Sequence, residues 1–222
     1  MLPDKNKVCT IFAGVEGVGR SSALGLMCRG IPKGYSLPYE CKGEDIKVYL
    51  QFDPVLGFIL DSRRINFSSS RRDIATDMIG RLAIDCVKRC FPFALRTDLT
   101  EEYWVELVKT LREYNYKINM VYIGVANTEV CIQRARAGID VNRLAKNMER
   151  RLDYVANILE YINEATFYSN DCGFRLEGVY KDGVFSYSQF GASDASWVHG
   201  IEVMLRTFEA GGCPELIPLD LG

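Results

Sequence analysis

The chain of 222 residues contains a single histidine, His199, and no two cysteines in a Cys-x-x-Cys arrangement. With so few nitrogen ligands and no paired thiolates, a metal–thiolate site is not expected. Several of the eight cysteines fall within apolar strand or helix patterns, so we expect reduced, buried thiols. His199 has no serine or cysteine nucleophile motif beside it, and we interpret it as a structural residue.

Long hydrophobic runs are also missing. No stretch reaches the roughly 18 apolar residues of a membrane-spanning helix, and the first residues lack the apolar run of a secretory signal. The net charge of only -2 leaves no global basic field, so a long nucleic acid is not an expected partner. The sequence therefore predicts a cytoplasmic globular protein with no membrane partner, for which small anionic ligands fit better.

Strand and helix patterns alternate along the first two thirds of the chain. Strands are expected at 7–13, 46–52, 57–60, 93–95, 118–125 and 166–168, and helices at 21–29, 72–90, 100–114, 128–137 and 142–163. A β-hairpin at 174–187, turning at Asp182-Gly183, and a helix at 194–208 follow. This order predicts an α/β fold, a mostly parallel sheet with helices on both faces. We expect one domain over 1–222, with a core at about 7–171 and the hairpin and last helix in 172–222.

A glycine-rich segment, Gly-Val-Glu-Gly-Val-Gly-Arg-Ser at 14–21, stands between the first predicted strand and helix. A P-loop has this placement, because small residues let backbone N–H groups converge on phosphate oxygens at the positive end of a helix. The usual pattern is Gly-x-x-x-x-Gly-Lys-[Ser/Thr]. The segment predicts a P-loop NTPase-type site made by Gly14, Val15, Glu16, Gly17, Val18, Gly19, Arg20, Ser21 and Ser22.

Two residues of this segment set its expected chemistry. Arg20 replaces the usual lysine, and Ser21 keeps the hydroxyl that binds magnesium. Arginine stays charged and binds phosphate, but its planar fork does not reproduce a compact ammonium. The motif thus supports phosphate binding more firmly than catalysis. The alternative is a glycine-rich turn that joins strand to helix and binds nothing.

Further segments, in their order and spacing, resemble the zeta-toxin family of P-loop kinases. The similarity extends over roughly residues 8–171. The segments that carry it are Phe58-Ile59-Leu60-Asp61, Ile79-Gly80-Arg81-Leu82, Phe93 to Thr100, Asn115-Tyr116-Lys117-Ile118, Met120 to Val125, Arg134 with Arg136, Gly138 to Val141, Arg150 with Asn157-Ile158, and Ser169-Asn170-Asp171.

The resemblance implies transfer of a phosphoryl group from ATP or GTP to a hydroxyl of a small substrate, such as a nucleotide-activated sugar. Mg2+ would bind at Ser21, and Asp61, at the end of a strand, would be the general base. Arg20 would bind phosphate, and Arg134, Arg136 and Arg150 would stabilise charge on the transferred group. An antitoxin-like protein is an implied partner. The structural alternative for Asp61 is an exposed residue in a turn. For the arginines, the alternative is a solvated face of a helix.

The chain departs from the family pattern at several places. Arg96 and Asp98 replace a glutamate and a threonine, and the Gly-Gly-His turn near residue 138 has lost one glycine and its histidine. With Arg20, these changes favour a second hypothesis, a catalytically degenerate nucleotide-binding or protein-interaction module on the same fold. A kinase acting on RNA ends or nucleosides is a third hypothesis.

Overall fold

The structure is a computed structural model that describes residues 7–20, 22–23, 48–50, 71–100, 102–134, 140–188, 197–201 and 203. The helix predicted at 21–29 is described only in its first turn. The strand predicted at 57–60, together with Asp61, lies outside the described residues.

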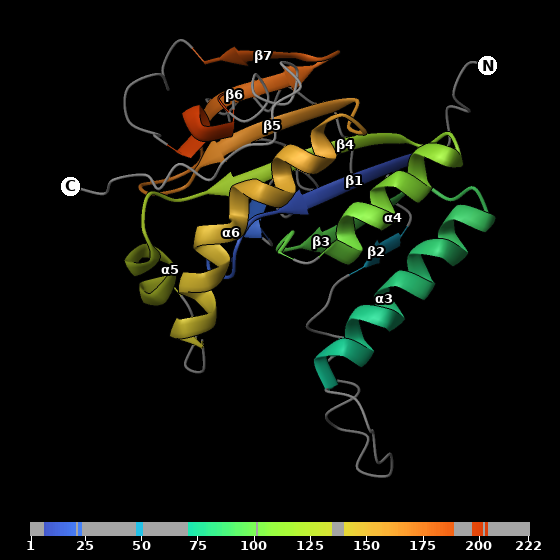
Figure 1. Cartoon of the computed structure of the whole chain (residues 1–222), viewed down its shortest axis with the longest axis horizontal. Helices are drawn as coiled ribbons and strands as arrows, with labels where there is room; N and C mark the ends of the chain where they lie inside the picture. Colours follow the sequence, from blue (N-terminus) through green and yellow to red (C-terminus); the bar gives the residue numbers. More distant parts are fainter. Residues whose placement is uncertain are drawn as a thin grey trace.

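The described strands form one seven-stranded sheet in the order β2-β3-β1-β4-β5-β6-β7 (Figure 1). The strands are β1 (Val8–Ala13), β2 (Val48–Leu50), β3 (Phe93–Thr97), β4 (Lys117–Gly124), β5 (Glu164–Ser169), β6 (Arg175–Lys181) and β7 (Val184–Tyr187). Strands β2 to β5 and β1 pair in parallel, whereas β6 and β7 pair antiparallel at one edge. The predicted α/β class and the C-terminal hairpin are therefore confirmed.

Three of the described helices share one hydrophobic cluster with the sheet, α3 (Arg71–Lys88), α4 (Glu102–Glu113) and α6 (Val141–Leu159). Figure 1 shows α4 and α6 in front of the strands and α3 beside β2, while the short α5 (Thr128–Arg134) lies at the edge where the parallel strands end. Residues 197–201, where the last helix was predicted, are helical. The strand–helix order matches the sequence pattern, because each amphipathic helix needs the sheet to bury its apolar side.

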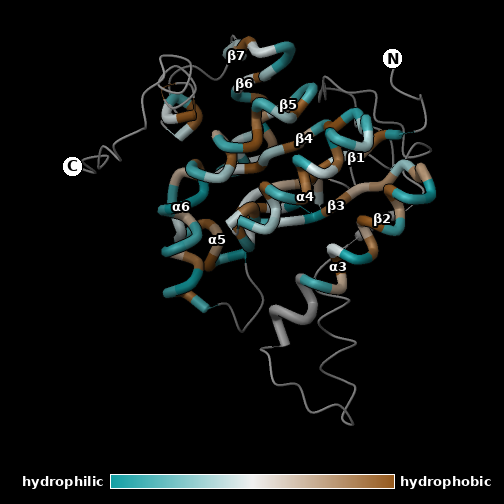
Figure 2. Tube along the Cα trace, turned by 45° about the vertical axis from the view of Figure 1, so that its right-hand side comes forward, coloured by the Kyte–Doolittle hydropathy of each residue, from teal (hydrophilic) through white to brown (hydrophobic). Residues whose placement is uncertain are grey.

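The core is divided between the two faces of the sheet. In β1, Ile11 packs with the helices of the front face, whereas its neighbour Phe12 packs with Val15, Val18 and Ala23 on the other face. This division follows from the two-residue period of a strand. Figure 2 shows the central strands as hydrophobic and α6 as alternating between hydrophilic and hydrophobic residues. Ala23, in the first turn after the glycine-rich loop, therefore packs in the cluster of Phe12, which also takes in Leu144 and Met148 from the first half of α6.

Some element ends differ from the prediction. The helix predicted at 142–163 ends at Leu159, since the N–H groups of Tyr161 and Ile162 return to carbonyls only three residues back. The Asn163 side chain then accepts a hydrogen bond from Ile118 N at 2.8 Å, and β5 starts one residue later. The apolar pattern predicted a longer helix because it includes Ile162, which is buried here although it lies outside the helix.

The prediction of buried thiols holds for three of the five described cysteines, which are all unpaired. Cys9, Cys86 and Cys131 are buried, whereas Cys90 and Cys172 are exposed. Cys90 follows the end of α3 with φ of 55°, so it has left the helical face that the sequence pattern assigned to it.

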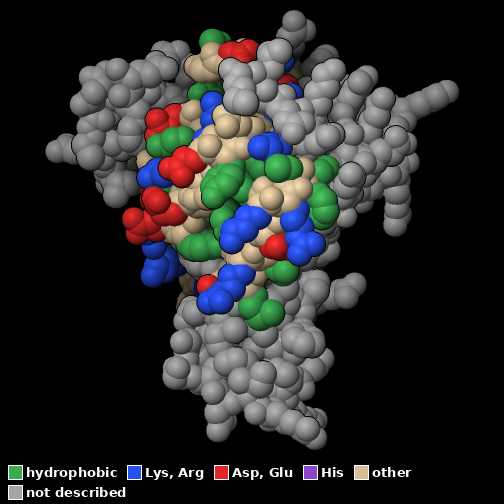
Figure 3. Space-filling view, turned by 90° about the vertical axis from the view of Figure 1, so that its right-hand side faces the viewer, with side chains coloured by type: hydrophobic (Ala, Val, Ile, Leu, Met, Phe, Trp, Pro, Cys, Tyr) green, Lys and Arg blue, Asp and Glu red, His purple; other side chains and the backbone are tan. Residues whose placement is uncertain are grey.

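Charges of both signs are mixed on the face that carries α3 (Figure 3). On α3 itself Arg81 pairs with Asp77, and Arg89 with Asp85, both at the i,i+4 spacing of a helix surface. Such exposed pairs contribute little stability, but they leave no single-sign field on the described part of this face. Among the described helices, none is both long enough and apolar enough to cross a membrane.

Candidate functional site

The glycine-rich loop lies at the carboxyl end of β1, at the point where the strand order of the sheet reverses. From β1 the chain proceeds to β2 on one side, whereas β4, its other neighbour, connects to β5 on the opposite side. Ligands of open parallel sheets bind in the crevice at such a switch point, beyond the carboxyl ends of the strands. The topology thus places residues 14–20 where a ligand is expected.

The backbone of the loop has the conformation that its glycines permit. Gly14, Gly17 and Gly19 have φ of 135°, 84° and 100°, values that residues with a side chain rarely adopt. A helix follows at once, since Ala23 N donates to Gly19 O at 3.0 Å. The first N–H groups of a helix have no partner within it, so they are free to bind an anion.

Neighbouring elements support the loop closely at each of these glycines. An added Cβ would lie 2.2 Å from Ile123 O at Gly14, 2.7 Å from Cys131 O at Gly17 and 2.6 Å from Asn170 Nδ2 at Gly19. These contacts belong to β4, to α5 and to the segment after β5. Three glycines are therefore required by packing as well as by backbone conformation.

Asn170 holds the loop from the side of β5. Its Nδ2 donates to Val18 O at 2.7 Å in a buried bond, and its own N–H donates to Gly124 O at 2.9 Å. Next to it, Asp171 accepts hydrogen bonds from Ala126 N at 2.9 Å and from the Ser169 hydroxyl at 2.6 Å. The Ser169-Asn170-Asp171 segment therefore ties β4, β5 and the glycine-rich loop together.

An Asn170→Ala variant is expected to lose about 1–3 kcal/mol of unfolding free energy, because the buried Val18 carbonyl loses its partner. Nucleotide affinity should fall with it. Asn163→Ala is the matched control: its amide oxygen supports Ile118 N at the opposite edge of the sheet, so it should lower stability alone. Urea unfolding and calorimetric ATP titration measure the two effects. Equal affinity in both variants would contradict this role of Asn170.

The structure places the predicted site arginines in different surroundings. Arg134 donates to the backbone carbonyls of Asn170 and Asp171, the latter at 2.7 Å, so it braces the segment that supports the loop. Arg150 donates to the Tyr154 hydroxyl at 2.5 Å, and its guanidinium lies 5.2 Å from the centre of that ring. Arg136, Ser21 and Asp61 lie outside the described residues.

The remaining predicted loop residues divide by exposure. Val15 and Val18 are buried in the core below the loop, Arg20 is half-buried, and Glu16 and Ser22 are exposed. The two valines therefore anchor the loop, and Arg20 is the cation placed at the first turn of its helix.

Arg151 is a functional candidate that the sequence reasoning missed. Its positive charge acts to lower the pKa of Cys131, the α5 residue against which Gly17 packs, and the pKa of Tyr122 on β4. Its helix has Met148 and Val155 buried on the sheet side, and Arg151 stands three and four residues from them. The same helical spacing in the sequence distinguishes Arg151 from Arg150, which lies about 100° further around the helix.

The sequence singled out Asp98 and Arg96 as departures from the family pattern, but it did not predict that Asp98 joins a polar cluster with α6. Asp98, after β3, accepts from Arg143 Nη2 at 3.3 Å and contacts Asn147 Nδ2 at 3.5 Å, both on α6. The Arg96 side chain on β3 is itself buried. These residues converge from separate parts of the sequence, and only the spatial order β3-β1-β4 brings them to one edge.

Positive charge gathers beneath the glycine-rich loop. Burial raises the pKa of the Cys131 thiol to about 11, although Arg134, Arg151 and Arg20 all act to lower it. The thiol is therefore protonated and unreactive at neutral pH. Three guanidinium groups act on Cys131, the α5 residue against which Gly17 packs, and this concentration of positive charge favours an anionic ligand beside the loop.

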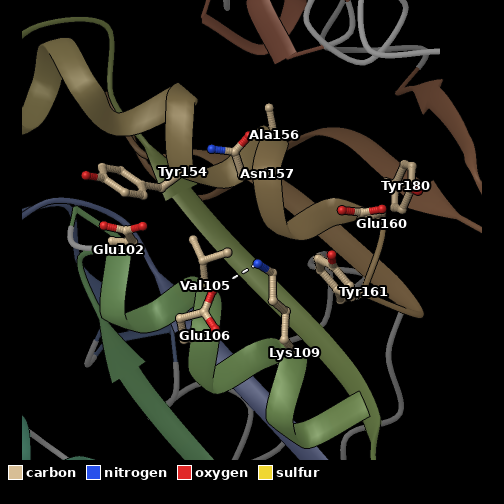
Figure 4. Close-up of a pocket in the computed structure, with 10 residues that line it drawn as sticks. All are labelled: Glu102, Val105, Glu106, Lys109, Tyr154, Ala156, Asn157, Glu160, Tyr161 and Tyr180. Atoms are coloured by element: carbon tan, nitrogen blue, oxygen red, sulfur yellow. Dashed lines mark hydrogen bonds and ion pairs between the residues drawn. The ribbon is translucent and has the colours of Figure 1, made fainter. Parts of the chain in front are cut away.

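A groove between α4 and α6 has the opposite character (Figure 4). It encloses about 670 Å³, and Glu102, Glu106 and Glu160 line it, with Lys109 bonded to Glu106 at 2.9 Å. The nearby Glu106 and Glu160 carboxylates raise the pKa of Lys109, which reflects a negative field. A polyphosphate is repelled from such a lining, so this groove is not the phosphate site.

No protein-family model and no curated protein matches the chain. Solved structures do. A structure from the PezAT chromosomal toxin–antitoxin system of Streptococcus pneumoniae aligns with a TM-score of 0.56 at 10% identity, over 94% of this chain and 86% of that one. The native AvrRxo1-ORF1:-ORF2 complex aligns with a TM-score of 0.60 at 11% identity, over 90% of this chain. The chain has the fold of the zeta-toxin-like P-loop kinases.

One similar structure contains a nucleotide. The AvrRxo1-ORF1:-ORF2 structure with ATP aligns with a TM-score of 0.55 at 13% identity. This chain spans 63% of the length of that chain, and 64% in the native complex. At such low identity the comparison with the zeta-toxin-like P-loop kinases concerns the fold, and activity has to be argued from the site.

Proposed function

We propose that the chain binds ATP or GTP with Mg2+ through residues 14–22 and transfers the terminal phosphoryl group to a hydroxyl of a small substrate. The observation that carries the proposal is the loop after β1, with three glycines at positive φ and a helix starting behind them. Backbone N–H groups and the helix dipole in this arrangement favour a polyphosphate. The ATP in one structure of the same fold supports it.

In this proposal the Mg2+ ion is bound mainly by the nucleotide and water, and by few protein ligands. Magnesium bound with a nucleotide keeps several waters and needs only one or two protein groups, and Ser21 is the residue that would hold it. In the described part of the chain, no cluster of three or more His, Cys, Asp or Glu side chains is arranged for a metal ion. The ion would therefore arrive with the triphosphate and neutralise its charge.

The residues of this chain divide the expected work. Arg20, at the first turn, pairs with phosphate oxygens, while Asp61 accepts the proton of the attacking hydroxyl as general base. A nucleotide-activated sugar is the acceptor class that we propose, and Arg136 belongs to the same charge-stabilising set. In this proposal Arg134 holds the segment after β5 in place, since its guanidinium donates hydrogen bonds to the backbone carbonyls of Asn170 and Asp171.

A catalytically degenerate nucleotide-binding or interaction module is the second candidate. It is favoured by Arg20 in place of lysine and by Arg150, which contacts Tyr154 at the rim of the acidic groove. A protein partner of the antitoxin type fits either candidate, because the similar structures come from a toxin–antitoxin system and a two-protein complex.

Calorimetric titration with ATP and GTP, each with and without Mg2+, tests the shared part of both candidates. We expect saturable binding that strengthens with Mg2+. No binding of either nucleotide at millimolar concentration would reject the proposal. Transfer of labelled γ-phosphate to nucleotide sugars then separates the candidates: a kinase loses transfer in Asp61→Ala and keeps nucleotide binding, whereas a degenerate module shows no transfer to lose.

A further inference from the structure

The groove between α4 and α6 combines acidic side chains with an apolar and aromatic lining (Figure 4). Its glutamates are exposed, whereas Val105 and Ala156 beneath them are buried. Tyrosine has an apolar ring and a polar hydroxyl, which suits a surface that meets a partner at the boundary with water. The groove residues used below are Glu102, Glu106, Lys109, Tyr154, Glu160, Tyr161 and Tyr180.

The carboxylates of the groove are neutralised only in part. In the described part of the chain, Glu106 has an ion-pair partner, Lys109 Nζ at 2.9 Å, whereas Glu102 and Glu160 have none. The lining thus sets three glutamates against one lysine. A cationic ligand would relieve this excess of negative charge.

An arginine of the chain itself already contacts one of the groove's tyrosines. The Arg150 guanidinium lies 5.2 Å from the centre of the Tyr154 ring, within the distance of a cation–π contact, and its Nη2 donates to the Tyr154 hydroxyl at 2.5 Å. Tyr161 and Tyr180 add two further rings to the lining. Because a guanidinium stacks on aromatic rings and pairs with carboxylates through two N–H groups, this lining favours arginine over lysine.

A metal ion, the other cation that carboxylates bind, does not fit the groove. Mg2+ and Ca2+ need several oxygen ligands within about 2–2.6 Å of one point. Among the residues that the structure describes, no three His, Cys, Asp or Glu side chains are grouped in this way. The volume of about 670 Å³, open between two helices, leaves room for several amino-acid side chains instead.

We propose that this groove binds an arginine-bearing segment of a partner protein, with guanidinium groups paired to its glutamates and stacked on its tyrosine rings. A protein segment is favoured over a small free cation, because apolar and aromatic contact area lies beside the charges. None of the lining residues belongs to the loop at 14–20 or to the segment at 169–171 that supports it. This site is therefore independent of nucleotide binding.

A short labelled peptide of alternating arginine and alanine is the probe, and fluorescence anisotropy measures its binding to the full chain. The same peptide with citrulline in place of arginine keeps the shape of the side chain and removes its charge. We expect the arginine peptide to bind at least about 10-fold more tightly than the citrulline peptide, with a lysine peptide between them.

Variants of the chain locate the binding. Replacing Glu102→Gln and Glu160→Gln together removes the two carboxylates without an ion-pair partner, and should weaken binding of the arginine peptide roughly 5- to 10-fold. Glu129→Gln is the matched control, because Glu129 is an exposed carboxylate in the first turn of α5 that does not line the groove. It should leave peptide binding unchanged.

Lys109→Gln should bind the arginine peptide about 2- to 5-fold more tightly, since it removes the internal cation that occupies Glu106. A gain of affinity has the further value that a misfolded variant does not produce it. Unchanged or weaker binding in Lys109→Gln would show that the peptide does not reach this carboxylate, and would overturn the inference.

Three other results would also overturn it: equal binding of the arginine and citrulline peptides, equal losses in the double glutamate variant and Glu129→Gln, or displacement of the peptide by an equal concentration of spermidine. The last would assign the groove to a small polyamine. ATP titration of the same variants should change by less than about twofold. If the wild-type chain binds the peptide and no nucleotide, the proposed function fails and this inference stands.

Discussion

Gly17→Ala is expected to abolish nucleotide binding, whereas Gly183→Ala leaves it intact. The two glycines have nearly the same backbone conformation, with φ of 84° and 82°. An alanine at either position therefore costs about 1–2 kcal/mol of unfolding free energy from the left-handed conformation alone. They differ in their surroundings, because nothing lies within 4 Å of a Cβ at Gly183, whereas Cys131 O lies 2.7 Å from one at Gly17.

The contact at Gly17 decides the larger effect. Its nearest atoms are the backbone O and Cα of Cys131 in α5, which cannot turn aside as a flexible side chain can. Loop and helix must separate, at a further cost of about 1–3 kcal/mol. The N–H groups that converge on phosphate then lose their geometry, and ATP affinity should fall by more than about 100-fold.

Urea unfolding and calorimetric titration, applied to both glycine variants, measure these effects separately. We expect a small, similar loss of stability from strain in both, an added loss in Gly17→Ala, and ATP binding only in Gly183→Ala. Retained ATP binding in Gly17→Ala would show that the loop does not form the phosphate site.

Arg20→Ala is expected to weaken ATP binding about 10- to 100-fold, the effect of removing one charged hydrogen-bonding partner from a phosphate. Arg20 stands at the first turn of the helix behind the loop, half-buried, and its charge reaches both Cys131 and Tyr122. The free energy of unfolding should change little, since the truncation removes a partly solvated cation from a site already rich in arginine.

Arg150→Ala provides the matched control for Arg20. Its guanidinium is exposed and bonded to the Tyr154 hydroxyl beside the acidic groove, so ATP affinity should stay within about twofold of wild type. Titration in low and high salt adds a second readout, because the phosphate contact of Arg20 is electrostatic and its loss should reduce the salt dependence. A larger effect of Arg150→Ala than of Arg20→Ala would reverse the assignment of these two arginines.

The site was predicted unevenly from sequence. Glycines at 14, 17 and 19 were recognised because strand, loop and helix are contiguous in the chain, so the local pattern contains the whole motif. Asn170 was singled out only by a family resemblance. Its hydrogen bond to the Val18 carbonyl, which joins residues 152 positions apart, could not be predicted from a local pattern. The family resemblance implies Arg150, whereas the structure shows that the charge of its neighbour Arg151 acts on Cys131 and Tyr122; one position in sequence is about 100° around a helix, which a motif match does not resolve.

The glycine-rich loop, the α/β class and the terminal hairpin were determined by the sequence itself, since they depend on local periodicity and on turn residues such as Asp182-Gly183. Tertiary structure alone decided which charges meet at the loop. The order β3-β1-β4 brings Asp98, Arg20 and Tyr122 to one edge of the sheet, and α6 adds the positive charge of Arg151 near Tyr122. Long-range strand pairing sets these neighbours, and no short-range pattern encodes it.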